Sequence, residues 1–365
     1  MNKKNITCFI CSLASGGAEH QLTELCRMLV DRGYVVTIAT FADVEDHYPC
    51  ATGVMRKRIA PNKGKIGKIL SIFWYFLRVR TDVVISFGQR ESFLCLIPLF
   101  FRRKIKVING ERNLTIGRNS RIERILVKWL YRRSDFIVSN SYSQARNIVS
   151  LAPNLANKTK TIINYLDTNL YVPSSEPQHN NPLRIGVFCR YAPQKNCERF
   201  IRVVELLKNK GLSFRIDWYG NQFGKNGQAN DYFMKIKGVA DSLDLGDYLY
   251  LNNNIKNVNE VMPQYDAICL PSLWEGFSNT IAEAISCGKL MLVSDVSDNS
   301  VMVEDNYNGF LFDPTSEEQI CGALEKFIHS TSEQRKIMGQ RSRERALHLF
   351  GAHGFIEEYL KLIEE

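Results

Sequence analysis

The sequence predicts an α/β protein made of two domains, each with a parallel, doubly wound β-sheet. Short apolar runs alternate with amphipathic helical patterns along the whole chain, as they do in such sheets. A polar, proline-rich segment at residues 172–182 interrupts this alternation and is the best candidate for a linker. With 365 residues the chain is long enough for two substantial cores. We therefore expect one domain at 1–172 and a second at 173–349.

The first half contains six expected strands and two clear helices. Strands are expected at 5–13, 35–41, 82–87, 105–109, 135–139 and 161–164, and helices at 19–32 and 121–133. The segment 56–80 mixes several Lys and Arg with a long apolar and aromatic run. A helix of this composition can lie on a membrane surface or pack on the core with basic edges, and the sequence leaves both alternatives open.

The second half repeats the same alternation. Strands are expected at 183–188, 213–219, 248–251, 267–270 and 290–294, and helices at 197–209, 231–243 and from residue 317 onward. Two doubly wound domains that face each other leave a cleft at the carboxyl ends of their strands, where ligands bind in such sheets.

The stretch from Ser272 to Gly288 is the strongest functional signal. It follows a short apolar strand, turns at Gly276, and continues as a helix that Ser278 or Asn279 can cap and Gly288 can end. Backbone N–H groups at the start of such a helix, here those of Ser278, Asn279 and Thr280, favour an anion such as a diphosphate.

Two carboxylates accompany this anion site. Glu275 lies in the turn and Glu283 lies early in the helix, so both can face a ligand whose phosphates rest between them. A diphosphate that carries many hydroxyl groups matches this arrangement. An ordinary strand-to-helix turn with two solvated acids fits the same stretch when it is taken alone.

Cations and glycines occur after other strands. Arg190 and Lys195 follow the strand 183–188 and leave the same sheet edge as Glu275, where a guanidinium fork and an ammonium group suit a diphosphate. Either one alone could be an ordinary surface cation. Gly16 and Gly17 lie between the first strand and the first helix, where they let the backbone approach a ligand closely. A glycine pair alone is a weak signal.

The net charge of +9 is unevenly distributed. Residues 1–172 contain 27 Lys and Arg against 12 Asp and Glu, whereas residues 173–365 contain 20 against 26. The basic half could meet anionic membrane lipid, a lipid diphosphate or nucleic acid, or it could be a solvated surface without a partner.

The ten cysteines are scattered through apolar surroundings, which favours reduced, structural thiols. Cys8 and Cys11 have the spacing of a metal or redox pair but are expected on opposite faces of one strand. The first residues resemble a short signal peptide, but their apolar stretch is short, and the longest later apolar run, 93–101, is about half of what a membrane-spanning helix needs. We expect a cytoplasmic protein.

These motifs together resemble glycosyltransferase family 4, the retaining nucleotide-sugar enzymes of GT-B fold, over nearly the whole chain. The resemblance is carried by residues 16–19, by Arg190 with residues 193–196, and by residues 275–283, including Phe277. Residues 110–113 and 308–312 add to it. It implies two Rossmann-like domains, a final helix, 350–365, that packs back on the first domain, and a donor site in the second.

The resemblance also implies roles for individual residues. Arg190 and Lys195 would neutralise the leaving diphosphate, Glu275 would hold hydroxyls of the donor sugar, and Glu283 would hold the ribose. Gly16, Gly17, Phe277, Ser278, Asn279 and Thr280 would complete the donor site. The chain contains no Asp-x-Asp motif, which favours neutralisation without a metal or other cofactor.

One departure from the family pattern concerns the first domain. Many relatives carry a histidine there near the donor sugar, but this chain has none between His47 and His179. Ser86, Gln89 or Glu111 could occupy that neighbourhood, and spacing assigns the role to none of them.

The sequence therefore supports three hypotheses. The first is a retaining glycosyltransferase that moves a hexose or N-acetylhexosamine from a nucleotide-diphosphate sugar, a UDP-sugar being favoured, to a glycan acceptor. That acceptor is expected to be lipid-linked, at the inner face of a bacterial membrane, in surface polysaccharide or glycoconjugate synthesis. The second is a non-catalytic nucleotide-sugar-binding protein of the same fold. A nucleic-acid-binding protein is weaker, because the basic residues follow no nucleic-acid motif.

Overall fold

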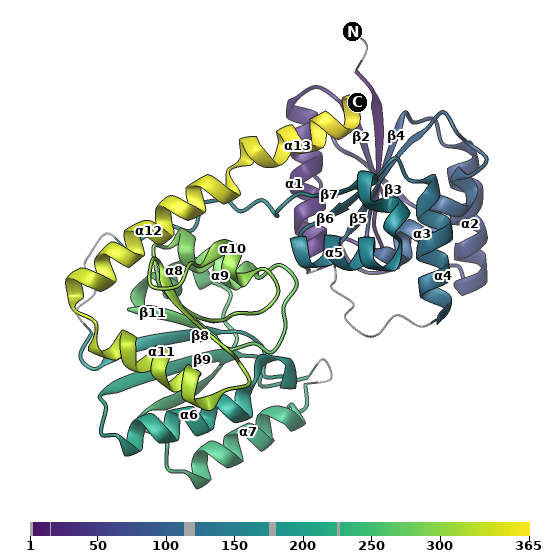
Figure 1. Ribbon diagram of the computed structural model, residues 1–365. Coiled ribbons are helices and arrows are strands. Elements are labelled where there is room, and N and C mark those ends of the chain that lie inside the picture. The colour runs from purple at the N-terminus through teal and green to yellow at the C-terminus, as the bar shows by residue number, and fades with distance from the viewer. Residues whose placement is uncertain (1–2, 15, 113–120, 175–179, 225–226) are drawn as a thin grey trace. The chain divides into compact units, whose positions relative to one another are not determined.

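The computed structural model describes residues 3–14, 16–112, 121–174, 180–224 and 227–365, without the side chains of 121–123. The chain divides into two compact units (Figure 1): unit 1 comprises Met1–Tyr165 and Ala352–Glu365, and unit 2 comprises Leu166–Gly351. The break after Tyr165 lies seven residues before the expected boundary at 172. Three parts of the motifs discussed above lie outside the described residues: Ser15 before the glycine pair, Asn113, and residues 175–179 of the expected linker.

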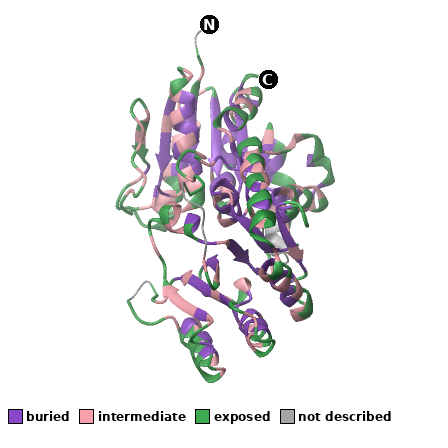
Figure 2. Cartoon of the chain, turned by 90° about the vertical axis from the view of Figure 1, so that its left-hand side faces the viewer, coloured by how far each residue is buried: buried purple, intermediate pink, exposed green. Residues whose placement is uncertain are grey.

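Unit 1 contains a parallel sheet of seven strands in the order β3-β2-β1-β4-β5-β6-β7. The strands are β1 (Asn5–Phe9), β2 (Val35–Thr40), β3 (Met55–Arg58), β4 (Val83–Phe87), β5 (Lys106–Glu111), β6 (Phe136–Ser139) and β7 (Thr159–Thr161). Buried Val and Ile dominate the central strands because helices cover both faces of the sheet, and Figure 2 shows the strands buried and the outer helix faces exposed.

The helices of unit 1 form two cores, one on each face of the sheet. They are α1 (Gly17–Asp31), α2 (Lys65–Arg78), α3 (Gln89–Leu99), α4 (Arg121–Leu130), α5 (Tyr142–Leu151) and α13 (Ala352–Glu364), with 3-10 turns at Tyr131–Arg133 and Pro153–Lys158. Helices α1 and α13 share one core with the sheet, and α2 to α5 share the other. Among the described residues, no helix is both long enough and apolar enough to cross a bilayer.

Helix α13 is tied into unit 1 although it ends the chain. Tyr359 is fully buried in the α1 core, and its hydroxyl accepts a hydrogen bond from Arg112 at 2.6 Å. Arg32 pairs with Glu357 at 2.7 Å, and the Lys4 ammonium donates to the Ile363 carbonyl at 2.7 Å. These contacts attach residues 352–365 to the first part of the chain.

Unit 2 contains a parallel sheet of six strands in the order β10-β9-β8-β11-β12-β13. The strands are β8 (Leu183–Phe188), β9 (Phe214–Gly220), β10 (Leu249–Asn253), β11 (Ala267–Leu270), β12 (Leu290–Ser294) and β13 (Gly309–Phe312). The chain order reverses between β8 and β11, and this switch point is where ligands bind in open α/β sheets.

The helices of unit 2 cover its sheet in the same way. They are α6 (Cys197–Asn209), α7 (Asp231–Ser242), α8 (Val258–Val261), α9 (Asn279–Ser286), α10 (Asn299–Met302), α11 (Glu317–His329) and α12 (Ser332–Phe350), with 3-10 turns at Pro193–Lys195 (η3) and Met262–Gln264. Helix α6 packs against α7 and α11, and α9 packs against α12.

The expected fold class, two parallel α/β sheets, is confirmed, with corrections to individual elements. β3 was missed because it is an edge strand of mostly charged, exposed residues, so it shows no apolar pattern. β13 was also missed as a strand, and the strand expected at 161–164 lies at Thr159–Thr161. β1 ends at Phe9, four residues before the expected end at Leu13. All ten cysteines are free thiols.

Candidate functional site

Arg190 lies just after the carboxyl end of β8, in a loop whose backbone is fixed by contacts with the neighbouring strands. The Tyr191 hydroxyl donates to the carbonyls of Trp218 and Asn252 at 2.9 and 2.8 Å, which ties the residue after Arg190 to β9 and β10. Gly220 at the end of β9 lets the backbone of this loop lie close to the strand, because a Cβ on Gly220 would lie 2.7 Å from the Cys189 carbonyl oxygen. Arg190 is exposed, and its guanidinium donates to the Gln194 amide oxygen at 2.8 Å.

Lys195 and Glu275 form an ion pair of 2.5 Å between the Lys Nζ and the Glu Oε1 atoms. Only 12% of the Lys195 side chain and 9% of the Glu275 side chain are exposed. Two hydrogen bonds of 2.8 Å join their loops, one from the Leu273 amide to the Gln194 carbonyl and one from the Gln194 side chain to the Trp274 carbonyl.

The turns on both sides of this pair are fixed by unusual backbone conformations. Asn196 has φ of +59°, which asparagine tolerates, and its side chain donates to the Pro314 carbonyl at 2.7 Å. Ser297 has φ of +55°, and its hydroxyl donates to the Glu275 carbonyl at 2.6 Å. Lys195 has three donors and Glu275 satisfies one of them, so the ammonium is held in place with donors left for a ligand.

Helix α9 begins beside Glu275, and Ser278 is its cap. The Ser278 hydroxyl accepts from the Ile281 amide at 3.4 Å, and Gly288, with φ of +66°, follows the helix end. The first N–H groups of any α-helix have no partner within the helix, so this turn offers donors to an anion. The Phe277 ring packs edge-on against Phe350, with centroids 6.0 Å apart, and Asn279 is exposed at the first helical position.

Thr280 connects α9 to the switch point of the sheet. Its hydroxyl donates to the Phe188 carbonyl, the last in β8, at 3.0 Å. We expect Thr280→Val to lower the free energy of unfolding by about 1 kcal/mol, because this carbonyl loses its partner. Thermal unfolding of the two proteins measures the loss, and Thr280→Ser, which keeps the hydroxyl, serves as the control. Equal stability of Thr280→Val and wild type would contradict the role of this bond.

Glu283 lies one turn further along α9, and burial raises the pKa of its carboxyl to about 7, while a hydrogen bond with Tyr171 lowers it in part. Its ionisation therefore occurs near neutral pH, instead of in the usual range of a glutamate. A carboxylate in this position accepts hydrogen bonds from ligand hydroxyls when it is charged and can donate one when it is protonated.

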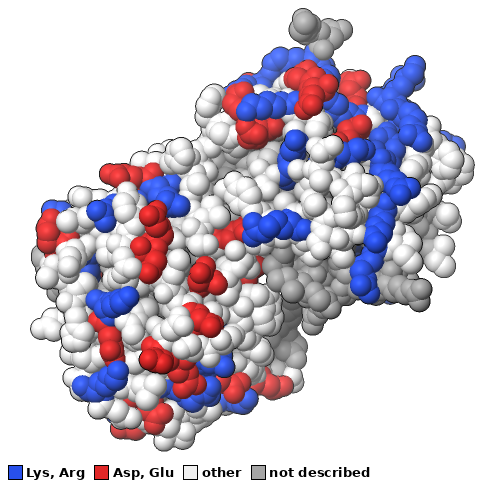
Figure 3. Space-filling model, viewed as in Figure 1, with Lys and Arg blue, Asp and Glu red and all other residues white. Residues whose placement is uncertain are grey.

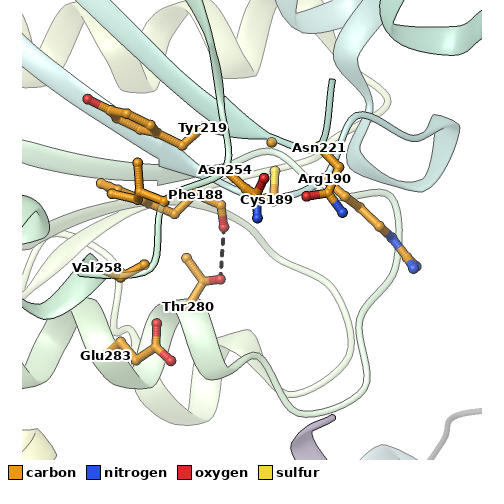
Figure 4. A pocket seen from close by; sticks show the side chains of 11 residues that line it. Phe188, Cys189, Arg190, Tyr219, Asn221, Asn254, Val258, Thr280 and Glu283 are labelled. Atoms are coloured by element: carbon orange, nitrogen blue, oxygen red, sulfur yellow. Dashed lines mark hydrogen bonds between the residues drawn. The ribbon is translucent and has the colours of Figure 1, made fainter. Parts of the chain in front are cut away.

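A pocket of about 240 Å³ opens at the carboxyl ends of β8, β9 and β10. It is lined by Phe188, Cys189, Arg190, Tyr219, Gly220, Asn221, Asn254, Ile255, Val258, Thr280 and Glu283. Figure 4 shows Thr280 and Glu283 on one side of it, with the Arg190 side chain extending away from them. Phe188 and Tyr219 stack with centroids 5.1 Å apart. The volume is below the roughly 300–1,000 Å³ of whole ligand sites, so the pocket suits part of a ligand.

The structure brings eight of the ten expected site residues together in unit 2: Arg190, Lys195, Glu275, Phe277, Ser278, Asn279, Thr280 and Glu283. The other two, Gly16 and Gly17, lie in unit 1 at the start of α1, and a Cβ on Gly16 would lie 2.2 Å from a Glu19 carboxylate oxygen. Their role towards a donor stays a prediction.

The residues considered in place of the family histidine differ in accessibility. Ser86 is fully buried, and its hydroxyl bonds to Ser92 and Asn109. Glu111 is buried beside Tyr131, and burial together with the nearby Glu91 raises its pKa to about 8. Gln89 is half-buried at the start of α3.

The sequence did not single out several residues of the pocket wall, notably Asn254, Ile255 and Val258. Asn254 and Ile255 follow β10 and Val258 begins α8, and they reach the pocket because β10 belongs to the same parallel sheet as β8, two strands away. The available signal was their place in the segment that follows a strand, since the carboxyl ends of parallel strands share one edge.

Two family models match the chain. The model described as "Glycosyltransferase Family 4" matches residues 15–170, and the one described as "Glycosyl transferases group 1" matches residues 174–345. The solved structure of HepE from Anabaena in complex with UDP-glucose is similar over 99% of both chains, with a TM-score of 0.81 and 18% identity.

Two curated relatives are similar in sequence. An uncharacterised glycosyltransferase of Methanocaldococcus jannaschii is 26% identical over 62% of this chain and 58% of its own length, so the match spans little more than half of that relative. The N-acetylgalactosamine-N,N'-diacetylbacillosaminyl-diphospho-undecaprenol 4-alpha-N-acetylgalactosaminyltransferase of Campylobacter jejuni is 22% identical over 93% of both proteins.

The two parallel sheets and the structural similarity define a GT-B fold. The two family models together extend over most of the chain, and the chain belongs to the family 4-type glycosyltransferases.

Proposed function

We propose that this protein is a retaining glycosyltransferase that transfers a hexose or N-acetylhexosamine from a UDP-sugar to a lipid-linked glycan acceptor. The observation that carries the proposal is the ion pair of Lys195 and Glu275, held beside the start of α9 and close to a pocket at the switch point of the sheet.

The arrangement suits the departure of a nucleoside diphosphate. Negative charge grows on the diphosphate as the bond to the sugar breaks, and fixed cations and N–H donors aimed at that charge lower the barrier. We assign this role to Lys195, Arg190 and the first turn of α9. In this proposal side chains offset the charge, without a metal or other cofactor. Glu275 would bind sugar hydroxyls, and Glu283 would bind the ribose.

The relatives support the choice of substrates. The Campylobacter enzyme is named for an acceptor linked to diphospho-undecaprenol, and HepE was solved with UDP-glucose. We therefore favour a UDP-sugar and a lipid-linked acceptor, in surface polysaccharide or glycoconjugate synthesis on the cytoplasmic side of a membrane. Retention is proposed because the element from Glu275 to Glu283 resembles that of the retaining family 4 enzymes.

A thermal-shift comparison of UDP with GDP tests the donor. A ligand that binds only the folded protein stabilises it by about 2.7 kcal/mol at 100 times its Kd. We expect UDP and UDP-sugars to raise the melting temperature and GDP to do so much less. A shift with GDP alone would overturn the UDP assignment, and no shift with either would overturn the nucleotide site.

The second candidate is a non-catalytic binding protein of the same fold, because the chain has no histidine between His47 and His179. A measurement of turnover distinguishes this candidate from an enzyme. We expect UDP release that depends on an added lipid-linked acceptor, with the anomeric configuration of the donor kept in the product, as NMR of the product would show. Binding of UDP-sugar without release in any acceptor mixture would favour the second candidate.

A further inference from the structure

One side of unit 1 exposes an unusual amount of apolar surface. Eight large apolar side chains on α2, α3, α4 and the residues after α3 are between 46% and 76% exposed: Ile66, Ile69, Leu70, Trp74, Ile97, Phe101, Ile125 and Trp129. The opposite sides of these helices are buried in the core, through residues such as Phe76, Leu96 and Leu130. Helix α3 packs against both α2 and α4, so the exposed residues belong to one continuous layer of helices.

The same layer is rich in cations. Its exposed Lys and Arg include Lys63, Lys65, Arg78, Arg80, Arg103, Lys104, Arg124, Lys128 and Arg132. Within residues 63–80, 89–104 and 124–133 the sequence contains a single carboxylate, Glu91, and it is buried. Figure 3 shows Lys and Arg gathering along the side of unit 1 where Figure 1 shows α2 to α4. We call these apolar and basic residues together the α2–α4 face.

Two further cations of the same layer have partners within the protein and do not belong to this face. Lys68 is paired with Asp43 at 2.7 Å, and the buried Arg133 donates to backbone carbonyls, so neither is counted in the face. The Arg78 guanidinium lies over the Trp74 ring, 4.9 Å from its centroid, so a cation and an interfacial aromatic ring project from the same part of α2.

We propose that the α2–α4 face docks on the surface of an anionic lipid bilayer. Isoleucine, leucine and phenylalanine gain from burial in the acyl boundary, tryptophan favours the headgroup level, and the surrounding cations meet lipid phosphates. Nucleic acid would satisfy the cations but leave the aliphatic side chains in water. The docking goes beyond sugar transfer and would bring the protein to the surface where a lipid-linked acceptor is anchored.

Liposome sedimentation with the full chain tests the proposal. The vesicles are phosphatidylcholine alone, or phosphatidylcholine with about one third phosphatidylglycerol, each at low and high salt. We expect the protein to sediment with the anionic vesicles at low salt, and at least tenfold less with the neutral vesicles or at high salt, since screening weakens surface attraction. Quenching of tryptophan fluorescence by brominated lipid should accompany binding and be reduced in Trp74→Phe/Trp129→Phe.

Two variants separate the apolar and basic contributions. Ile66→Ser/Ile69→Ser should weaken sedimentation about tenfold, as should Lys65→Glu/Lys128→Glu. A matched control, Leu347→Ser/Lys336→Glu on the exposed side of α12 in unit 2, should leave it unchanged. All variants should keep the thermal shift with UDP, which tests the donor site independently of docking and reports that they fold.

Three outcomes would overturn docking: no binding to anionic vesicles, equal loss in the α12 control, or binding to random duplex DNA that competes with the vesicles and is lost in the same variants. The last outcome would assign the face to nucleic acid.

Discussion

Replacing Lys195 with alanine is expected to lower the rate of sugar transfer by about 100- to 1,000-fold, the usual effect of removing one group that stabilises charge in a transition state. The ammonium is fixed by Glu275 at 2.5 Å and is only 12% exposed, so water cannot easily take its place beside the leaving diphosphate. Glu275→Gln should cause a loss of similar size, because it removes both the partner that orients Lys195 and an acceptor for sugar hydroxyls. Initial rates of UDP release measure both effects.

Stability must be followed in the same variants. Removing one member of a buried ion pair costs as much as about 3–5 kcal/mol, because the other charge is left without its partner. Circular dichroism and melting temperatures show whether each variant is folded, and Lys195→Ala/Glu275→Gln removes both charges together. Lys336→Ala, an exposed position on α12, is the control for loss of a lysine. Wild-type rates in both single variants would refute the assignment of these residues to catalysis.

Glu283→Gln is expected to stabilise the protein at pH 8 by up to about 3 kcal/mol, and at pH 5 by less than about 1 kcal/mol. Burial raises the folded-state pKa of Glu283 to about 7, above the ordinary 4.5. Between these values the folded protein binds more protons than the unfolded chain, so wild type loses stability as pH rises from about 4.5 to 7. A neutral glutamine does not incur this loss.

Urea unfolding at pH 5, 6, 7 and 8 measures this difference between wild type and Glu283→Gln. Glu344→Gln, an exposed acid in the middle of α12, is the matched control and should follow wild type at every pH. If Glu283 binds the ribose, the more stable variant should also show a smaller thermal shift with UDP. A stability difference that does not change with pH would show that the carboxyl titrates in its ordinary range.

The α9 region was predictable because its signals are local. The apolar strand Ala267–Leu270, the Ser278 cap and the glycine after the helix follow one another within about twenty residues, and each was expected where the structure has it. The two-sheet class was predictable for the same reason, since strand and helix periodicities are properties of short windows. The edge strand β3 was not, because its residues are exposed and only pairing with β2 defines it.

The sequence by itself determined the alternation of strands and helices, the helix start beside Glu275, and the excess of positive charge in the first half. Tertiary structure decided the pairing of Lys195 with Glu275 across 80 residues, the pocket wall from Asn254 to Val258, and the character of α2. That helix buries Ile72 and Phe76, so it packs on the core, and it also exposes Ile66 and Trp74. Contact of the exposed side with a membrane stays a proposal. The physical reason is that caps, turns and periodicity act between neighbouring residues, whereas contacts between distant loops depend on the order of strands in the sheet.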